Sequence, residues 1–228
     1  MNSHWQTHPD TDQLDQELAA HVAGLLKKDL ELTGAASLAV SGGSTPKGLF
    51  RCLSGYPLDW ANIGITLVDE RWVDCSSPDS NEQLMLDNLI QGEAKAARVV
   101  GLKTSHASAE EGLAEARQRI ADMHQPFSAV ILGMGGDGHT ASWFPQSANL
   151  SNLLDPSGID QVAITDPVTA PHQRITLTLS AVLNSREIIV HITSRKKRAV
   201  LESASQNQFP IAAILEQTVT PVSIWWAP

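Results

Sequence analysis

The sequence has few of the features that send a chain out of the cytosol or into a membrane. Only 2 of its 228 residues are cysteine, too few for a disulfide framework, and they form no CxxC pair. We expect Cys52 and Cys75 to be buried free thiols in a reducing compartment. No run approaches the roughly eighteen apolar residues that a spanning helix needs. Residues 1–10 lack the basic and apolar regions of a signal peptide, so a cytoplasmic protein is expected.

Positive charge is also scarce. The 16 Lys and Arg residues face 25 Asp and Glu residues, which leaves a net charge of −9. Such a chain repels phosphodiester backbones and anionic membranes, and we expect neither a nucleic-acid nor a membrane partner. The histidines and cysteines show no metal-ligand spacing such as HExxH, so no metal site is expected. The oligomeric state stays open between a monomer and a homodimer.

The remaining composition is that of an ordinary globular protein. Apolar residues make up 42% of the chain and charged residues 18%, far from the balance of disordered chains. A chain of this length buries most of its apolar surface in one core. No repeat, low-complexity tract or linker divides it. We therefore expect one domain spanning residues 1–228.

Short apolar segments alternate with helical patterns along the chain. Apolar residues recur at helical spacing over residues 12–32, and further helices are predicted after Pro46, at 80–89, from Ser108 and at 194–205. Strands are predicted at 37–40, 63–68, 98–100, 129–132, 162–164, 175–179, 188–192 and 222–226. Continuous apolar strands between helices predict an α/β fold with a mostly parallel sheet and helices on both faces.

In such a fold, ligands bind beyond the carboxyl ends of the strands, so we expect the functional residues in the turns that follow the strands. The turn at residues 41–46, Ser-Gly-Gly-Ser-Thr-Pro, has two glycines that let the backbone approach a ligand. Gly42, Gly43, Ser44 and Thr45 are the candidates there. The alternative is an ordinary capped turn. It is no Walker A loop, because GK[ST] does not follow the glycines.

Two further turns carry clustered charges. Asp69-Glu70-Arg71 follows the apolar strand that ends at Val68, and a solvated, salt-bridged loop is the alternative reading. Lys197 belongs to a cationic run, residues 195–198, at the start of a helix, where positive charge opposes the macrodipole. These cations could bind phosphate or form a solvated face. His172 and Arg174 are weaker candidates of the same kind.

The fourth turn combines glycines with reactive groups. Its sequence, LGMGGDGHT, contains GxGxxG, but the acidic residue about twenty positions on lies in a loop instead of ending a second strand, so dinucleotide binding is rejected. His139 is the side-chain type whose unperturbed pKa suits base catalysis near neutrality, and Asp137 could orient it. A structural histidine is the alternative. No GxSxG elbow is present, which disfavours a serine nucleophile.

Taken together, the motifs SGGSTP, VDER, SN at residues 80–81, LGMGGDGHTASWFP, RITLTL and the late lysine resemble the 6-phosphogluconolactonase family. This family lies within a group that includes glucosamine-6-phosphate deaminase, and the match spans nearly the whole chain. The resemblance implies a modified Rossmann-like sheet and hydrolysis of 6-phosphoglucono-δ-lactone to 6-phosphogluconate in the oxidative pentose phosphate pathway. It also implies a sugar phosphate lactone as the small-molecule partner and no cofactor.

Carried over by position, the resemblance makes His139 the general base with Asp137 beside it. Gly43, Ser44 and Thr45 would line the phosphate or sugar pocket, and Arg71 and Lys197 would supply cations. We expect Arg71 to help stabilise the oxyanion. The departures are small, since Gly136 and Asp74 stand where proline is frequent in the family, and they remove no reactive group.

Two alternatives come from the same resemblance. The deaminase branch carries a glutamate five positions after the histidine for its proton relay, whereas this chain has Phe144, which cannot transfer protons. Related folds also serve as non-catalytic sugar-phosphate sensors, because a fold by itself does not determine function. Such sensors usually adjoin a DNA-binding segment, and none is visible in this sequence.

Overall fold

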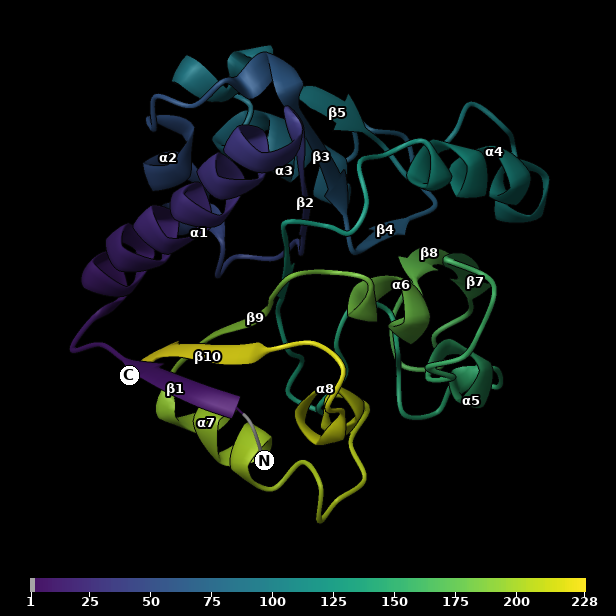
Figure 1. The fold of residues 1–228 in the computed structure, drawn as a ribbon. Coiled ribbons are helices and arrows are strands. Elements are labelled where there is room, and N and C mark those ends of the chain that lie inside the picture. Colours follow the sequence, from purple (N-terminus) through teal and green to yellow (C-terminus); the bar gives the residue numbers. More distant parts are fainter. Residues whose placement is uncertain (1–2) are drawn as a thin grey trace.

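A computed structural model describes residues 3–228 of the chain. Its main element is a seven-stranded parallel sheet in the order β1-β10-β9-β6-β2-β3-β5 (Figure 1). The strands of this sheet are β1 (Ser3–Thr7), β2 (Ala36–Val40), β3 (Ile63–Leu67), β5 (Arg98–Val100), β6 (Ala129–Leu132), β9 (Ile188–Thr193) and β10 (Val222–Ala227). The α/β fold with a mostly parallel sheet is confirmed.

Helices cover both faces of the sheet, as predicted. Since crossovers between parallel strands are right-handed, α1, α2 and α3 lie on one face and α4, α6 and α7 on the other. The helices are α1 (Thr11–Thr33), α2 (Lys47–Ser54), α3 (Asn81–Asn88), α4 (Ala109–Ala121), α5 (Leu150–Leu153), α6 (Leu179–Leu183), α7 (Arg195–Glu202) and α8 (Ala212–Glu216). Short 3-10 turns at Trp60–Asn62 and Gly92–Ala96 directly precede β3 and β5.

The longest helix, α1, shows how the sequence pattern becomes structure. Its buried residues, which include Leu14, Leu18, Val22 and Leu26, recur every four positions and therefore face the sheet. The Asp10 side chain accepts a hydrogen bond from the Gln13 amide at 2.8 Å and caps the first turn. Beyond its last turn the chain turns away through a left-handed residue, Gly34. The predicted helix at residues 12–32 is thus confirmed.

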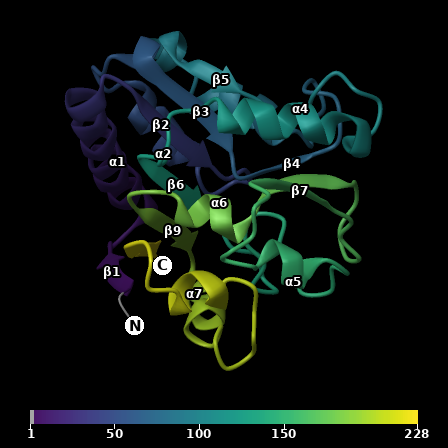
Figure 2. The same cartoon turned by 45° about the vertical axis from the view of Figure 1, so that its right-hand side comes forward.

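A second, smaller sheet was not predicted. It contains β4 (Asp69–Arg71), β8 (Arg174–Leu177) and β7 (Val162–Thr165), paired antiparallel in that order. The predicted strands at 162–164 and 175–179 thus belong outside the parallel sheet, because their partners are each other and β4. The segment expected as a charged loop after Val68 is itself a strand. Helix α4 packs against β7 and β8 (Figure 2).

Other differences concern short elements and polar ends. The polar segment Ser3–Thr7 forms edge strand β1, because it pairs in register with β10. Leu179 begins the short helix α6 instead of ending a strand, since the Thr178 side chain caps the Ala181 amide. The two cysteines are free but half-buried, not fully buried. In residues 3–228, no helix is long and apolar enough to cross a membrane.

The order of the strands determines where a ligand fits. From β2 the chain proceeds toward β5, and from β6 it proceeds toward β1, although β2 and β6 are neighbours. The direction of winding thus reverses between β2 and β6. A crevice at the carboxyl ends of two such strands is the usual ligand site of open α/β sheets. The two glycine-rich turns noted in the sequence directly follow these two strands.

Candidate active site

A cavity of about 490 Å³ lies at this reversal point. It is lined by every predicted binding residue and by two of the three predicted catalytic ones: Gly42, Gly43, Ser44, Thr45, Arg71, His139, His172, Arg174 and Lys197. Asp137 lies behind His139 and is hydrogen-bonded to it. The tertiary structure therefore brings together four turns that are separated by up to about 150 residues in the sequence.

His139 and Asp137 form a close pair at the end of β6. The His139 Nδ1 atom lies 2.6 Å from Asp137 Oδ1, and the His139 amide donates to the same oxygen at 3.2 Å. Burial alone would raise the pKa of Asp137, but the contacts with His139 outweigh it and hold that pKa below its ordinary value. An ionised carboxylate can only accept, so Nδ1 is the donor of this pair, and in the neutral form of the ring the lone pair is on Nε2.

Gly135 makes room for this pair. A Cβ atom at this position would collide with the His139 ring and with Asp137 Oδ1. The Gly135 amide also donates to the His139 carbonyl at 2.8 Å, which closes the loop on itself. The glycines of this turn therefore serve to fold an acid and an imidazole against the backbone, not to approach a pyrophosphate.

The other side of the imidazole faces an apolar ring. The Phe144 ring centroid lies 4.4 Å from that of His139, and Phe144 is almost fully buried. In residues 3–228, the carboxylate that contacts His139 is that of Asp137. Phe144 thus shields one face of the imidazole and offers it no group for proton exchange.

Two arginines face each other across the small sheet. Arg71 of β4 and Arg174 of β8 are directly opposed in the antiparallel register. Arg174 is 5% exposed, and burial followed by the positive charge of Arg71 lowers the pKa of Arg174. Each guanidinium holds one loop, because Arg71 donates to the Asp79 carbonyl and Arg174 to the Pro171 carbonyl at 3.1 Å. Within residues 3–228, the buried Nε atom of each has no hydrogen-bond partner.

Lys197 approaches the cavity from the other side, in the first turn of α7. Its Nζ donates to the Met134 carbonyl in the turn after β6, which explains why a cation can stand at a helix N-terminus. Desolvation lowers the pKa of Lys197, with Asp137 opposing that effect and Lys196 adding to it. Ser194, the residue that caps this helix, has a φ of 77°, a conformation that L side chains rarely adopt.

His172 lies at the mouth of the cavity. Its Nε2 is 3.2 Å from Asp79 Oδ2, so this pair links the loop after β7 to the loop after β4. Both side chains are partly exposed. An exposed pair of this kind contributes little stability by itself.

Three residues left unassigned by the sequence also build the site. Buried Glu70 accepts hydrogen bonds from the Asn81 and Glu82 amides at 2.8 and 2.7 Å and from Ser80 Oγ at 3.0 Å, and so fixes the start of α3. Burial raises the pKa of Glu70 although these bonds lower it. The Asn81 amide group donates to the Asp69 carbonyl at 2.9 Å and fills the space beside Gly42. The Ser-Asn motif at residues 80–81 was the available signal.

Asp69 places a second carboxylate at the cavity wall. It is 9% exposed and accepts a hydrogen bond from Ser142 Oγ at 2.6 Å. Within residues 3–228, no three His, Cys, Asp or Glu side chains gather as candidate metal ligands. The polar groups of the cavity therefore include an imidazole with its acid, three cations, the backbone and hydroxyl donors of the turn at 41–46, and Asp69.

Comparison with known proteins identifies the family of this chain. Residues 9–225 match the model of the family described as glucosamine-6-phosphate isomerases/6-phosphogluconolactonase. A 6-phosphogluconolactonase of Mesorhizobium japonicum is 40% identical over 226 residues, which cover 98% of this chain and 95% of the relative. The chain belongs to the 6-phosphogluconolactonase family. The family expected from the sequence motifs is thereby confirmed.

Solved structures extend the likeness to the fold. The crystal structure of a 6-phosphogluconolactonase from Shewanella baltica superposes with a TM-score of 0.96 at 42% identity, covering 99% of this chain and 98% of that one. A monomeric glucosamine-6-phosphate deaminase shares the fold with a TM-score of 0.75 at 19% identity, covering 97% of this chain and 96% of that one. Since both branches of the family share one fold, the residues of the site must separate them.

Proposed function

We propose that His139 is the general base with which this chain hydrolyses 6-phospho-D-glucono-1,5-lactone to 6-phospho-D-gluconate. The 6-phosphogluconolactonase activity itself, a step of the oxidative pentose phosphate pathway, follows from the full-length relatives described above. The roles of the individual residues are the proposal. The observation that carries it is the pair at the end of β6, in which Asp137 holds Nδ1 at 2.6 Å while the imidazole lines the cavity.

The reaction needs one proton moved twice. His139 Nε2 takes a proton from water as the water oxygen attacks the lactone carbonyl carbon, and the carbonyl oxygen becomes an oxyanion. When the tetrahedral intermediate collapses, the bond from the carbonyl carbon to the ring oxygen breaks, and Nε2–H returns the proton to that oxygen. Asp137, which stays ionised, stabilises the imidazolium between the two transfers, as an acid does in other base-and-acid pairs.

The cations provide for the two negative charges of the reaction. The phosphate of the substrate is a dianion near neutrality, and the carbonyl oxygen gains charge as water attacks. Lys197, Arg174 and the donors of residues 42–45 are proposed to bind the phosphate, and Arg71 to help stabilise the oxyanion. The direct opposition of Arg71 and Arg174 supports an anion site, because like charges facing each other across two strands are otherwise unfavourable.

The deaminase reaction is the weaker candidate. Ring opening and isomerisation need a proton relay next to the histidine, and the residue in that place is Phe144, which is 5% exposed and in contact with the imidazole. Lactone hydrolysis needs an activated water and no second relay. Freshly prepared 6-phosphogluconolactone should be turned over, and glucosamine 6-phosphate should not. That no metal or cofactor takes part stays a prediction, as does the cytoplasmic location.

His139→Gln tests the proposal most directly. A positioned base contributes roughly 10²- to 10⁴-fold to turnover, so kcat should fall by that factor while the protein stays folded and KM changes little. His106→Gln is the matched control, because His106 also faces a carboxylate, Glu115 at 3.6 Å, but lies away from the cavity. Near-native turnover in folded His139→Gln would remove His139 from the mechanism.

A further inference from the structure

A carboxylate lies beneath the glycine-rich turn, on the side away from the cavity. Asp15 belongs to α1, and its side chain is 13% exposed. Its carboxylate occupies the space that a Cβ atom on Gly48 would fill, so it lies against the first turn of α2. The Leu49 amide stabilises its charged form as a hydrogen-bond donor. The N-cap residue of α2, Pro46, makes no side-chain capping bond, and Asp15 supplies the missing acceptor from another helix.

The same helix terminus faces the proposed phosphate site. Residues 41–46 line the cavity and lead directly into α2. The free N–H groups and the positive end of the macrodipole at such a terminus attract anions. A bound phosphate would therefore approach α2 from the cavity while Asp15 already contacts it from below. The phosphate and the Asp15 carboxylate would then both interact with the N-terminus of α2.

One imidazole separates Asp15 from the cavity. His191 of β9 lines the cavity and is 2% exposed. Its Nε2 lies 3.6 Å from Asp15 Oδ1, too far for a good hydrogen bond. Neither ring nitrogen has a hydrogen-bond partner in the described part of the chain, residues 3–228. A buried polar group without a partner is costly. A hydrogen bond from an O–H group to a ring nitrogen of His191 would therefore be favourable.

The charges around Asp15 do not neutralise it. Burial is the largest effect and raises the pKa of Asp15 to about 6. Asp12 of the same helix adds to this rise, and Arg51 of α2 opposes it. Cys52, also on α2, has a pKa raised by burial and by the charge of Asp15. Burial lowers the pKa of His191 to about 4, so near pH 7 a charged carboxylate lies beside a neutral ring.

We propose that Asp15 takes up a proton from solvent when phosphate binds at residues 41–46, and that it is a positioning residue whose charge is coupled to the occupancy of that site. The proposal rests on the phosphate pocket of the proposed function. A dianion at the shared helix terminus repels the carboxylate, and the repulsion ends when Asp15 is neutral. Protonated Asp15 still accepts from the Leu49 amide through its carbonyl oxygen, and its O–H can donate to His191 Nε2. The proton returns to solvent when the anion leaves.

Sulfate is a suitable probe, because it has the shape of phosphate and does not titrate near pH 6. Its binding is measured by calorimetry from pH 5 to 8 in a His139→Gln background, which removes the titration of the active-site imidazole. Sulfate should bind more weakly as the pH rises through about 6, by roughly tenfold for each unit by which it raises the pKa of Asp15. In the Asp15→Asn variant of this background, the affinity should stay high at pH 8 and lose this dependence.

His191→Leu in the same background identifies the proton acceptor. The pH dependence should survive, since Asp15 takes up the proton. Loss of the dependence in His191→Leu, together with its survival in Asp15→Asn, would overturn the proposal in favour of the imidazole. An equal pH dependence in the parent and in Asp15→Asn would also overturn it, because an amide at this position cannot take up the proton.

Two measurements separate this coupling from the proposed function. If Lys197→Ala does not weaken sulfate binding, the phosphate pocket itself is wrong; if it does, while Asp15→Asn changes nothing, only the coupling is wrong. Carboxyl ¹³C NMR on the unmodified protein needs no variant at all. Saturating sulfate should move the titration midpoint of Asp15 to higher pH, and an unchanged midpoint would contradict the proposal.

Discussion

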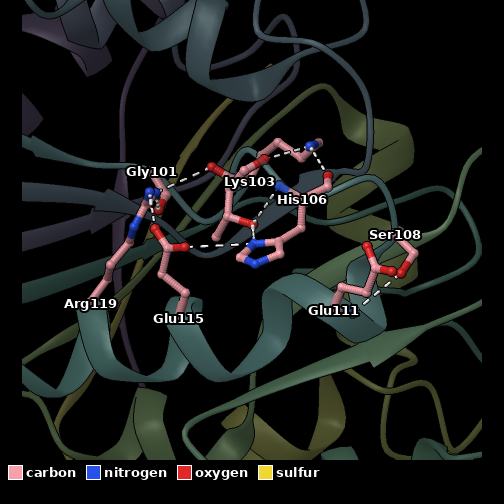
Figure 3. A network of polar contacts seen from close by, with 8 residues as sticks. Gly101, Lys103, His106, Ser108, Glu111, Glu115 and Arg119 are labelled. Carbon is pink, nitrogen blue, oxygen red and sulfur yellow. Dashed lines mark hydrogen bonds and ion pairs between the residues drawn. The ribbon is translucent and has the colours of Figure 1, made fainter.

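The molecule holds two clusters of charged side chains, and they are built in opposite ways. In the α4 network, which comprises Lys103, Thr104, His106, Glu115 and Arg119, each cation has a carboxylate, carbonyl or aromatic partner (Figure 3). Arg119 pairs with Glu115 at 2.6 Å and donates to the Gly101 carbonyl at 3.0 Å. Lys103 Nζ donates to the His106 carbonyl at 3.0 Å and lies 4.3 Å from the centre of the Trp72 ring.

The pocket cations Arg71, Arg174 and Lys197 lack a carboxylate partner of the kind that Glu115 provides for Arg119. In residues 3–228 none of the three forms an ion pair, and two of them face each other across a strand pair. Their polar contacts are mostly to backbone carbonyls. Charges that the protein does not neutralise itself are available to a bound anion. We therefore expect the α4 network to stabilise the fold, and the pocket cations to lower stability in exchange for the proposed anion binding.

Among the changes that compare these two clusters, removing Lys197 should have the largest effect. Lys197→Ala is expected to cost at least about 1.5–3 kcal/mol in kcat/KM on the phosphorylated lactone, the range for a hydrogen bond to a charged group. Unphosphorylated gluconolactone, already a poor substrate, should be affected much less, because the remote phosphate holds the carbonyl against the base. Lys103→Ala, in the α4 network, should leave both rates unchanged. Equal losses on the two substrates would mean that Lys197 acts at the carbonyl.

Asp15→Asn should raise the free energy of unfolding above pH 6, by about 1–3 kcal/mol. The pKa of Asp15 is raised by burial from 3.8 to about 6 in the folded state. The folded protein therefore binds this proton more tightly than the unfolded chain, and ionised Asp15 costs stability above pH 6. The gain should shrink as the pH falls from 6 and vanish below about 4. Urea unfolding at several pH values measures it.

The control for this change lies one turn earlier on α1. Asp12 is exposed, and Asp12→Asn should alter the free energy of unfolding by less than about 0.5 kcal/mol at any pH. A constant gain from pH 4 to 8 in Asp15→Asn would show that burial of the charge is not its cause.

Methionine in place of one arginine from each region should shift stability in opposite directions. Arg174→Met removes a desolvated charge opposite Arg71, so the free energy of unfolding should rise by about 0.5–1 kcal/mol while kcat/KM falls. Arg119→Met removes the bond to Glu115 and two hydrogen bonds to backbone carbonyls. Its free energy of unfolding should therefore fall by about 1 kcal/mol, with kcat/KM unchanged. Thermal unfolding and kcat/KM on the phosphorylated lactone, measured for both variants, test this contrast. A loss of stability in both variants would abolish the contrast between the regions.

The smallest effect concerns the two serine caps. Ser194, before α7, has a φ of 77° and a ψ of 148°, whereas Ser108, before α4, has a φ of −114°. Glycine at residue 194 relieves the backbone strain, and this gain exceeds the loss of the serine's capping hydrogen bond. The free energy of unfolding of Ser194→Gly should therefore rise by about 0.5 kcal/mol. Ser108→Gly should lose a few tenths of a kcal/mol. Chemical unfolding of both variants gives the comparison, and a loss at residue 194 as large as at 108 would mean that its backbone is relaxed.

The sequence by itself determined the parallel sheet and the list of reactive residues. A short run rich in β-branched residues, such as residues 188–192, favours a buried strand. Glycines with an acid and an imidazole directly after a strand indicate a reactive turn, because both signals depend on the local sequence. The predicted helix at residues 12–32 likewise follows from spacing alone. Family membership was also visible, since its motifs are separate and occur in order.

Only the tertiary structure decided which partners these residues meet. The charged segment at residues 69–71 became a strand because β8 offered it a partner about one hundred residues away, and this pairing set Arg71 opposite Arg174. From the sequence, Asp15 is an ordinary polar residue of a helix. In the structure it lies against α2 and His191 and is largely buried. Pairing and burial depend on contacts between distant segments, and these contacts, unlike periodicity, leave no mark in the local sequence.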